Sequence, residues 1–161
     1  MLFWILITVG VVVLDQITKW LAVEYLIPVG TVPIIKDAVH LTYVENPGAA
    51  FGMMQNSRWI FLLVSSVAIV AIIVYLIKFA PKNKLALTSL AFILGGGIGN
   101  MIDRVALGYV VDFIDFRLIN FAVFNVADSF VCVGVGLFIL EIILELKKEI
   151  KDGKNKADAD N

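Results

Sequence analysis

The stretch 124–146, FNVADSFVCVGVGLFILEIILEL, is apolar over almost its whole length and has a carboxylate, Asp128, close to its start. Only Glu141 and Glu145 interrupt the apolar run that follows Asp128. A run of about 20 apolar residues is long enough to cross a bilayer as a helix. A carboxylate at the edge of hydrocarbon is costly, so Asp128 is a candidate functional residue.

The whole chain has the composition of a polytopic membrane protein. Of its 161 residues, 60% are hydrophobic and only 17% are charged, with a mean hydropathy of +0.93. Soluble domains normally carry more charge. We predict four spanning helices, at about Leu2–Leu21, Trp59–Ile77, Leu85–Arg104 and Phe124–Leu146. The first is interpreted as a retained span and not a cleaved signal peptide, because no basic residue precedes it.

Lysine placement predicts the orientation of these spans. Lys78, Lys82 and Lys84 lie between the second and third spans, and five lysines follow Leu146. The positive-inside rule then places both termini in the cytoplasm. We expect one membrane domain, residues 1–146, followed by a polar cytoplasmic tail, residues 147–161, that is a frayed helix end or disordered.

Counting along the spans from those lysines predicts the depth of the acidic residues. About 20 residues from either cytoplasmic end bring the chain to the outer surface. Asp128 then lies at the outer boundary, Asp112 lies in the second outer loop at the same level, and Asp15 lies in the outer third of the first span. Two carboxylates brought together can share a proton and activate a water molecule.

The first outer loop, residues 25–58, is too long for a simple turn. Its segments Val29–Ile35 and Val39–Val44 are rich in β-formers, and Lys36-Asp37 separates them. This pattern predicts a small extracytoplasmic β-hairpin or curved sheet. The segment 46–57 that follows suits a lid or an interfacial half-helix.

Several other polar residues near the outer boundary have two interpretations each. Asp15 and Lys19 share a helix face and can pair, either as part of a site or as an ion pair that snorkels to the interface. Arg104, on the same face as Asn100, either holds a carboxylate or substrate carbonyl or snorkels. Asp128, three residues after Asn125, also suits a simple helix cap.

The remaining motifs favour structural interpretations. Gly95 and Gly99 form a small-residue face for close helix packing. The single cysteine, Cys132, excludes disulfides within the chain and a cysteine-based metal site. The single histidine, His40, is expected to be a loop residue and not a metal ligand. Asp115 and Arg117 are expected to make loop and headgroup contacts, and the charge pattern does not suggest nucleic acid.

The residues alone therefore leave two function classes open, an aspartyl hydrolase and a transport protein. A small proton-coupled exporter would use acidic residues near the bilayer midplane, whereas Asp112 and Asp128 are predicted at the outer boundary. Intramembrane aspartyl proteases with a Gly-x-Gly-Asp motif are a further alternative. Here Asn100 follows Gly97-Ile98-Gly99, so the aspartate of that motif is missing.

Five motifs in order along the chain closely resemble those of the bacterial lipoprotein signal peptidases, also called the signal peptidase II family. The motifs are DQITK at 15–19, NPGAAF at 46–51, GGGIGNMIDR at 95–104, GYVVDF at 108–113 and FNVAD at 124–128. The resemblance extends from Asp15 to Asp128. It implies four transmembrane helices, a small extracytoplasmic β-rich cradle, and both termini in the cytoplasm of a bacterial cell with the chain in the inner membrane.

The same resemblance implies an aspartyl endopeptidase that removes the signal peptide from diacylglyceryl-modified prolipoproteins, cutting before the lipidated cysteine. By motif position, Asp112 and Asp128 are the catalytic pair. The residues implied to support the site or bind substrate are Asp15, Lys19, Asn46, Gly48, Gly96, Asn100, Arg104, Asn125 and Ala127. No metal or organic cofactor is expected. Expected partners are membrane lipid and inhibitors such as globomycin and myxovirescin.

Overall fold

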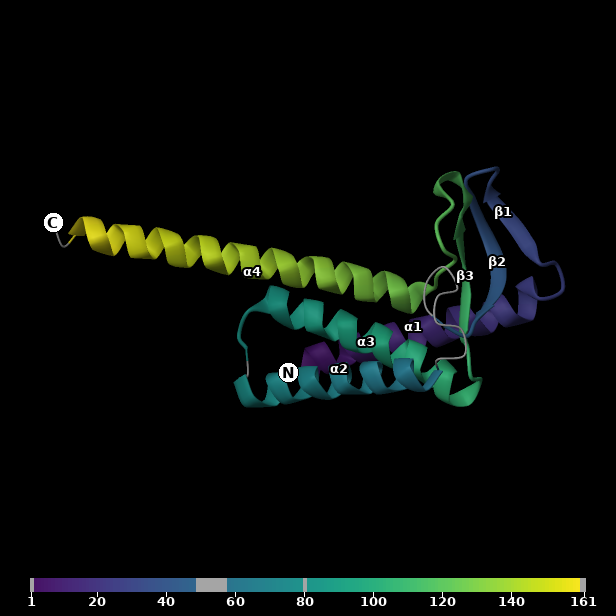
Figure 1. Ribbon diagram of the computed structural model, residues 1–161, viewed down its shortest axis with the longest axis horizontal. Helices are drawn as coiled ribbons and strands as arrows, with labels where there is room; N and C mark the ends of the chain where they lie inside the picture. Colours follow the sequence, from purple (N-terminus) through teal and green to yellow (C-terminus); the bar gives the residue numbers. More distant parts are fainter. Residues whose placement is uncertain (1, 49–57, 80, 160–161) are drawn as a thin grey trace.

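Four long helices make up most of the protein (Figure 1). The structure, a computed structural model, describes residues 2–48, 58–79 and 81–159. The helices are α1 (Leu2–Leu26), α2 (Arg58–Phe79), α3 (Lys84–Ala106) and α4 (Val126–Ala159). Each is long and apolar enough to cross a membrane, which confirms the predicted four-span architecture. The segment 49–57, which contains most of the predicted lid, lies outside the described residues.

α4 is longer than the sequence predicted. It continues through the polar residues that follow Leu146 and ends at Ala159. In Figure 1 it extends well beyond the ends of the other three helices. The polar segment is therefore a continuation of the fourth helix.

α3 lies at the centre of the bundle and packs against the other three helices. Its buried face is rich in small residues, among them Gly95, Gly96 and Gly99. No residue of α2, all of which is described, is buried within the protein. Most of the apolar surface of α2 is thus available to lipid.

The glycines of α3 and α4 permit close helix contacts. A Cβ atom on Gly95 would lie 2.6 Å from Cβ of Val11 in α1. A Cβ atom on Gly134 of α4 would lie 2.8 Å from the carbonyl oxygen of Ser89 in α3. Small residues at such positions let helix backbones approach within van der Waals contact in a membrane. The packing interpretation of the glycine-rich motif is confirmed.

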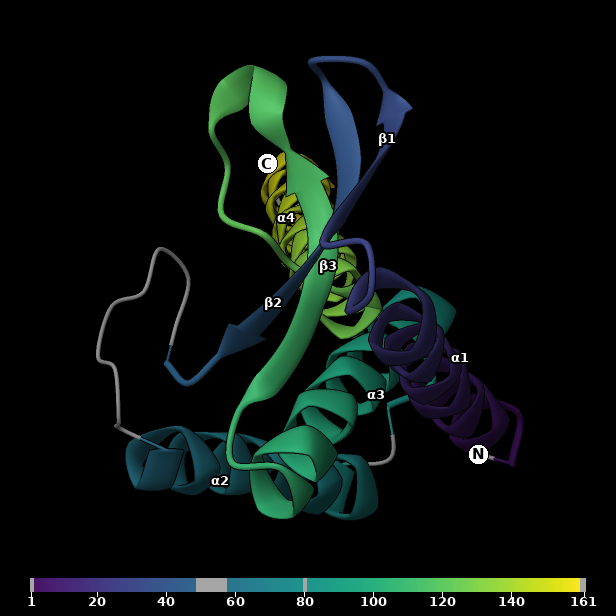
Figure 2. The ribbon, with the colours of Figure 1, turned by 90° about the vertical axis from the view of Figure 1, so that its right-hand side faces the viewer.

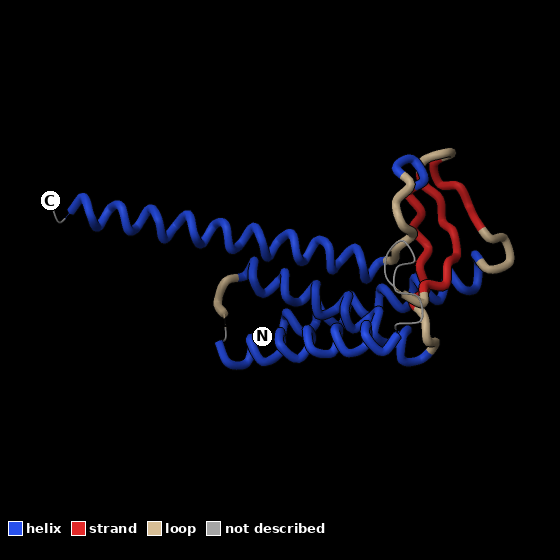
Figure 3. Tube along the Cα trace, viewed as in Figure 1, coloured by secondary structure: helices blue, strands red, loops and turns tan. Residues whose placement is uncertain are grey.

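A three-stranded antiparallel sheet lies at the end of the bundle where α1 and α3 end and α4 begins (Figures 2 and 3). Its strands are β1 (Thr31–Ile35), β2 (Val39–Asn46) and β3 (Val110–Phe116), in the order β1-β2-β3. The predicted hairpin is confirmed, with Asp37 in the left-handed region at its turn. β3 was not predicted: the sequence placed Asp112 in a loop, but it lies in the middle of this strand.

Two further residues that the sequence assigned to loops, His40 and Asp115, belong to the sheet, and Arg117 lies in the turn that follows it. His40 lies in β2 opposite Asp115 of β3, and its side chain is buried. Asp115 accepts hydrogen bonds from Arg117 and from the Thr42 hydroxyl, both at 2.8 Å. Although desolvation opposes them, these hydrogen bonds hold the pKa of Asp115 below its usual value. The Asp115–Arg117 pair thus joins the sheet to the turn that follows it. The loop placement predicted for Asp115 is wrong, and the predicted headgroup contacts stay a prediction.

Candidate active site

Asp112 of β3 and Asp128 of α4 line the same cavity, which has a volume of about 410 Å³. Arg104 of α3 lies in its wall. The other polar lining residues include Asn46 and Asn100, and residues 121–124 supply an apolar wall. The structure therefore brings together the two carboxylates that the sequence singled out.

Asp112 is 1% exposed and is held by two amide side chains. Asn46 Nδ2 donates to one carboxylate oxygen at 2.8 Å, and Asn125 Nδ2 donates to the other at 2.7 Å. Burial raises the pKa of Asp112 to about 7; the Asn46 and Asn125 hydrogen bonds oppose the rise, whereas the nearby Asp128 charge adds to it. Near neutral pH, Asp112 can therefore carry a proton.

Asp128 has two structural roles at once. Asn125 precedes the first residue of α4, and its Oδ1 accepts a hydrogen bond from the Asp128 amide at 2.9 Å. In return, the Asp128 carboxylate accepts a hydrogen bond from the backbone N–H of Asn125 at 3.2 Å, which completes a reciprocal helix cap. Its other oxygen accepts from Asn100 Nδ2 at 2.7 Å. The capping interpretation is correct, and one carboxylate oxygen still faces the polar cluster.

The two asparagines between the carboxylates have defined orientations. Because the Asn125 oxygen accepts from the α4 backbone, its NH₂ group points at Asp112. The Asn100 oxygen accepts from Asn125 at 3.0 Å and from Lys19 at 2.8 Å, so the Asn100 NH₂ group points at Asp128. The carboxylates are thus joined through a continuous chain of hydrogen bonds.

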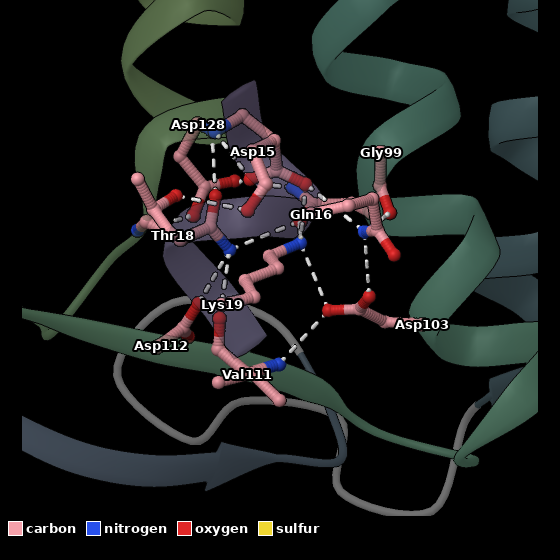
Figure 4. A network of polar contacts seen from close by, with 12 residues as sticks. Asp15, Gln16, Thr18, Lys19, Gly99, Asp103, Val111, Asp112 and Asp128 are labelled. Atoms are coloured by element: carbon pink, nitrogen blue, oxygen red, sulfur yellow. Dashed lines mark hydrogen bonds and ion pairs between the residues drawn. The ribbon is translucent and has the colours of Figure 1, made fainter. Parts of the chain in front are cut away.

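Lys19 lies at the centre of a buried ionic cluster (Figure 4). It is 3% exposed and forms ion pairs with Asp15 at 2.9 Å and Asp103 at 2.8 Å, besides its bond to Asn100. Three acceptors match the three N–H groups of an ammonium ion. Asp15 is fully buried, so the alternative of a pair that snorkels to the interface is wrong.

This cluster ties together the elements that carry the candidate pair. Asp15 of α1 accepts from the Ala127 amide at the start of α4, at 2.9 Å. Asp103 of α3 accepts from the Val111 amide at 3.1 Å, one residue before Asp112. Figure 4 shows the connection between Asp103 and Val111. Breaking the cluster would therefore release the backbone next to both Asp112 and Asp128.

Sequence reasoning did not assign Asp103 or Gln16 to the site. Gln16 Nε2 donates to Asp103 at 3.0 Å and to the Gly99 carbonyl at 3.3 Å. Helical spacing gave a signal for Asp103, since it follows Asn100 by three residues and Gly99 by four. Gln16 had no comparable signal beyond its position next to Asp15.

Arg104 is directed into the protein and not toward the interface. Its guanidinium donates to the Gly48 carbonyl at 3.3 Å and lies 5.1 Å from the ring centre of Phe61. These contacts hold Arg104 in the wall of the cavity that contains both carboxylates. The snorkelling alternative is wrong for this residue as well.

Two further α4 residues, Ser129 and Cys132, line the cavity. The sequence predicted Cys132 to be a small apolar residue in the span, without a place in the site. Gly96 lies against the first turn of α4, and a Cβ atom there would meet the Ala127 carbonyl oxygen. Close packing of α3 on α4 at Gly96 thus fixes the position of the first turn of α4, which carries Asp128.

Comparison with known proteins gives the family. A sequence model described as signal peptidase (SPase) II matches residues 7–144. The chain belongs to the signal peptidase II family. The lipoprotein signal peptidase of Caldanaerobacter subterraneus subsp. tengcongensis is 58% identical over 130 residues, which cover 81% of this chain and 88% of that protein. The lipoprotein signal peptidase of Brevibacillus brevis is 44% identical over 147 residues, which cover 91% and 99%.

Solved structures agree with this family assignment. A bacterial membrane enzyme determined by the in meso method matches with a TM-score of 0.82 and 32% identity, over 92% of both chains. A second in meso structure matches with a TM-score of 0.79 and 33% identity, over 88% of this chain and 93% of the other. The four spans and the sheet are thus the fold of a membrane peptidase family.

Every residue that the motifs assigned to the signal peptidase II site lies in or against the cavity and the ionic cluster. The set comprises Asp15, Lys19, Asn46, Gly48, Gly96, Asn100, Arg104, Asp112, Asn125, Ala127 and Asp128. Their spatial grouping is established, and their chemical roles follow below as proposals.

Proposed function

We propose that Asp112 and Asp128 are the catalytic pair of this membrane aspartyl endopeptidase, which removes the signal peptide from diacylglyceryl-modified prolipoproteins just before the lipidated cysteine. Membership of the signal peptidase II family supports the activity and the substrate class. The observation that carries the assignment of residues is that two buried carboxylates from different elements line one cavity and are linked through Asn100 and Asn125.

In the proposed mechanism, Asp112 starts protonated and Asp128 starts ionised. Asp128 removes a proton from a water molecule, whose oxygen attacks the scissile carbonyl carbon, while Asp112 donates its proton to the carbonyl oxygen. The resulting tetrahedral intermediate breaks its C–N bond, the leaving amine takes the proton held by Asp128, and one hydroxyl of the intermediate returns a proton to Asp112 as the carboxylic acid product forms. The raised pKa of Asp112, about 7, supports its role as the initial acid.

The cavity also offers groups for substrate binding. The Arg104 guanidinium, already in the wall, is suited to donate hydrogen bonds to a substrate backbone carbonyl. The apolar wall at residues 121–124 is suited to side chains of the signal peptide next to the scissile bond. The cyclic peptide globomycin and the macrolide myxovirescin would occupy this same cavity and compete with substrate.

The proposed location is the bacterial inner membrane, with both termini cytoplasmic and the cavity at the outer boundary. A substrate whose diacylglyceryl group is anchored in the outer leaflet would present its scissile bond at that level. Membrane lipid is accordingly part of the proposed working environment.

Cleavage of a lipidated lipobox peptide by the purified protein tests the assignment. Asp112→Asn and Asp128→Asn preserve side-chain size but remove a proton acceptor or donor, and loss of general acid–base catalysis costs about 10²–10⁴-fold in rate. Asp152→Asn, on the exposed extension of the same helix α4, is the control and should retain activity. Near-normal cleavage by either Asp112→Asn or Asp128→Asn would refute the assigned pair, and proton-driven transport without cleavage would support the exporter instead.

A further inference from the structure

A second cavity, of about 330 Å³, lies between the C-terminal end of α1 and the sheet. Thr18, Leu21 and Tyr25 of α1 line one side, and Leu41 of β2 and Phe113 of β3 line the other. Its volume is within the range of about 300–1,000 Å³ that is common for small-molecule sites. The mechanism proposed above does not use this cavity.

β3 separates this second cavity from the candidate active site. Successive side chains of a strand point to opposite faces of a sheet. Accordingly Asp112 lines the first cavity and its neighbour Phe113 lines the second. Any ligand that packs against Phe113 therefore supports the backbone of the strand that carries Asp112.

The lining of the second cavity is suited to hydrocarbon. Its lining residues are apolar or aromatic apart from Thr18, and none is charged. The Thr18 hydroxyl is already bonded to the carbonyls of Leu14 at 2.9 Å and Asp15 at 2.8 Å, which leaves its methyl group for packing. A polar ligand would lose its hydration here, and among the lining side chains only the Tyr25 hydroxyl would be left to compensate with a hydrogen bond.

The mouth of the cavity is continuous with the lipid-facing surface of α1. Leu14, Leu21 and Tyr25 are 46%, 39% and 64% exposed, and with Thr18 they follow one another at helical spacing. The surface that faces the bilayer along the span thus leads directly into the cavity. Tyr25 at its mouth, with Trp20 exposed nearby, is typical of the membrane–water interface.

We propose that this cavity binds one acyl chain of a bilayer phospholipid, which packs against Phe113 and supports β3 from behind Asp112. The occupant is a lipid of the surrounding membrane and not the diacylglyceryl group of the substrate. An acyl chain that enters this cavity passes from the hydrocarbon of the bilayer to an apolar lining, so it gives up neither hydration nor hydrogen bonds on entry. The proposal does not depend on which residues perform the cleavage.

The test uses the full chain in nanodiscs that contain a phosphatidylglycerol with a photoactivatable diazirine on its acyl chain. After illumination, mass spectrometry should find lipid adducts enriched on Leu41 and Phe113 relative to the exposed apolar residues of α2. Leu21→Trp places a larger ring at the mouth and should lower these adducts several-fold. Leu14→Trp, an equally large change lower on the same face, should leave them unchanged.

Adducts spread evenly over all lipid-facing residues would overturn the proposal, as would adducts on Phe113 that Leu21→Trp does not reduce. Repeating the labelling with an excess of diacylglyceryl peptide substrate distinguishes the two possible occupants, a bilayer phospholipid and the lipid group of the substrate. If the substrate lipid displaced the labelled phospholipid from Leu41 and Phe113, the cavity would be a substrate site and the proposed occupant would be wrong.

Discussion

At the scale of single residues, the site depends on two amide side chains, and groups other than the proposed catalytic pair, Asp112 and Asp128, fix their orientations. The Asn125 amide is oriented by the α4 backbone, and the Asn100 amide is oriented by the Lys19 ammonium group. Each then directs an NH₂ group at one carboxylate. These contacts distinguish the two carboxylates, because only Asp112 is held between two side-chain amides, those of Asn46 and Asn125.

This environment predicts the pH dependence of cleavage. The pKa of Asp112 is raised to about 7, so its proton is present below that pH and is lost as the pH rises through it. With Asp112 ionised, the pair has no proton for the carbonyl oxygen, and cleavage of the lipidated peptide should fall above about pH 7. The Asn46 hydrogen bond lowers the pKa of Asp112, so Asn46→Ala should move the falling limb of the profile to higher pH. A profile that does not move would show that Asp112 does not govern this limb.

A second prediction concerns the stability of the buried ionic cluster. Lys19→Met would leave Asp15 and Asp103 without their shared cation. Removing one partner of a buried ion pair typically costs about 3–5 kcal/mol. We expect a large fall in the thermal unfolding temperature in detergent, together with loss of cleavage. Lys36→Met, at the exposed hairpin turn, is the matched control, and equal unfolding temperatures for the two variants would contradict the structural role of Lys19.

At the scale of elements, the site is assembled where α1, α3, β3 and α4 meet. The sequence predicted the helices because their apolar lengths are a local property. It did not predict β3, although Val110, Val111, Phe113 and Ile114 favour strands, because two aspartates interrupt the apolar pattern and the partner strand is far away in sequence. The contact between Asp15 and the Ala127 amide joins residues 112 positions apart, a pairing that the sequence pattern did not specify.

The α3–α4 contact gives a prediction at this scale. A Cβ atom on Gly96 would lie 2.7 Å from the Val131 side chain and would also meet the Ala127 carbonyl oxygen. Gly96→Ala should therefore push the first turn of α4, with Asp128, away from α3, and both cleavage and thermal stability should fall. On Gly97 the nearest atom to a Cβ would be 3.8 Å away, in Ile69. Gly97→Ala should keep its cleavage activity, and its free energy of unfolding should rise by up to about 1 kcal/mol because Ala has a higher helix propensity than Gly. If both variants lost cleavage activity and stability equally, the contact of Gly96 with α4 could not be the cause.

At the scale of the whole molecule, the candidate site lies at one end of a four-helix bundle, beside a sheet that covers that end (Figure 3). The sequence predicted that Asp112 and Asp128 reach the same level, since span lengths and lysine positions determine depth. It did not predict which side chains contact one another at that depth, because the depth of a residue does not determine which helices lie next to each other in the membrane. The buried cluster around Lys19 emerges only when α1 and α3 are packed together.

The orientation of the bundle gives the last prediction. Lys36, in the hairpin turn, should face the extracytoplasmic side, and Lys82, between α2 and α3, should face the cytoplasm, because lysine-rich connections are retained inside. Both side chains are exposed, so a cysteine at either position can react without disturbing the fold. Cys132 is exposed and lines the cavity, so Cys132→Ala is the required background. In intact cells, a membrane-impermeant maleimide should label Lys36→Cys at once and Lys82→Cys only after permeabilisation. Labelling of both from outside would contradict the proposed orientation and, with it, the extracytoplasmic position proposed for Asp112 and Asp128.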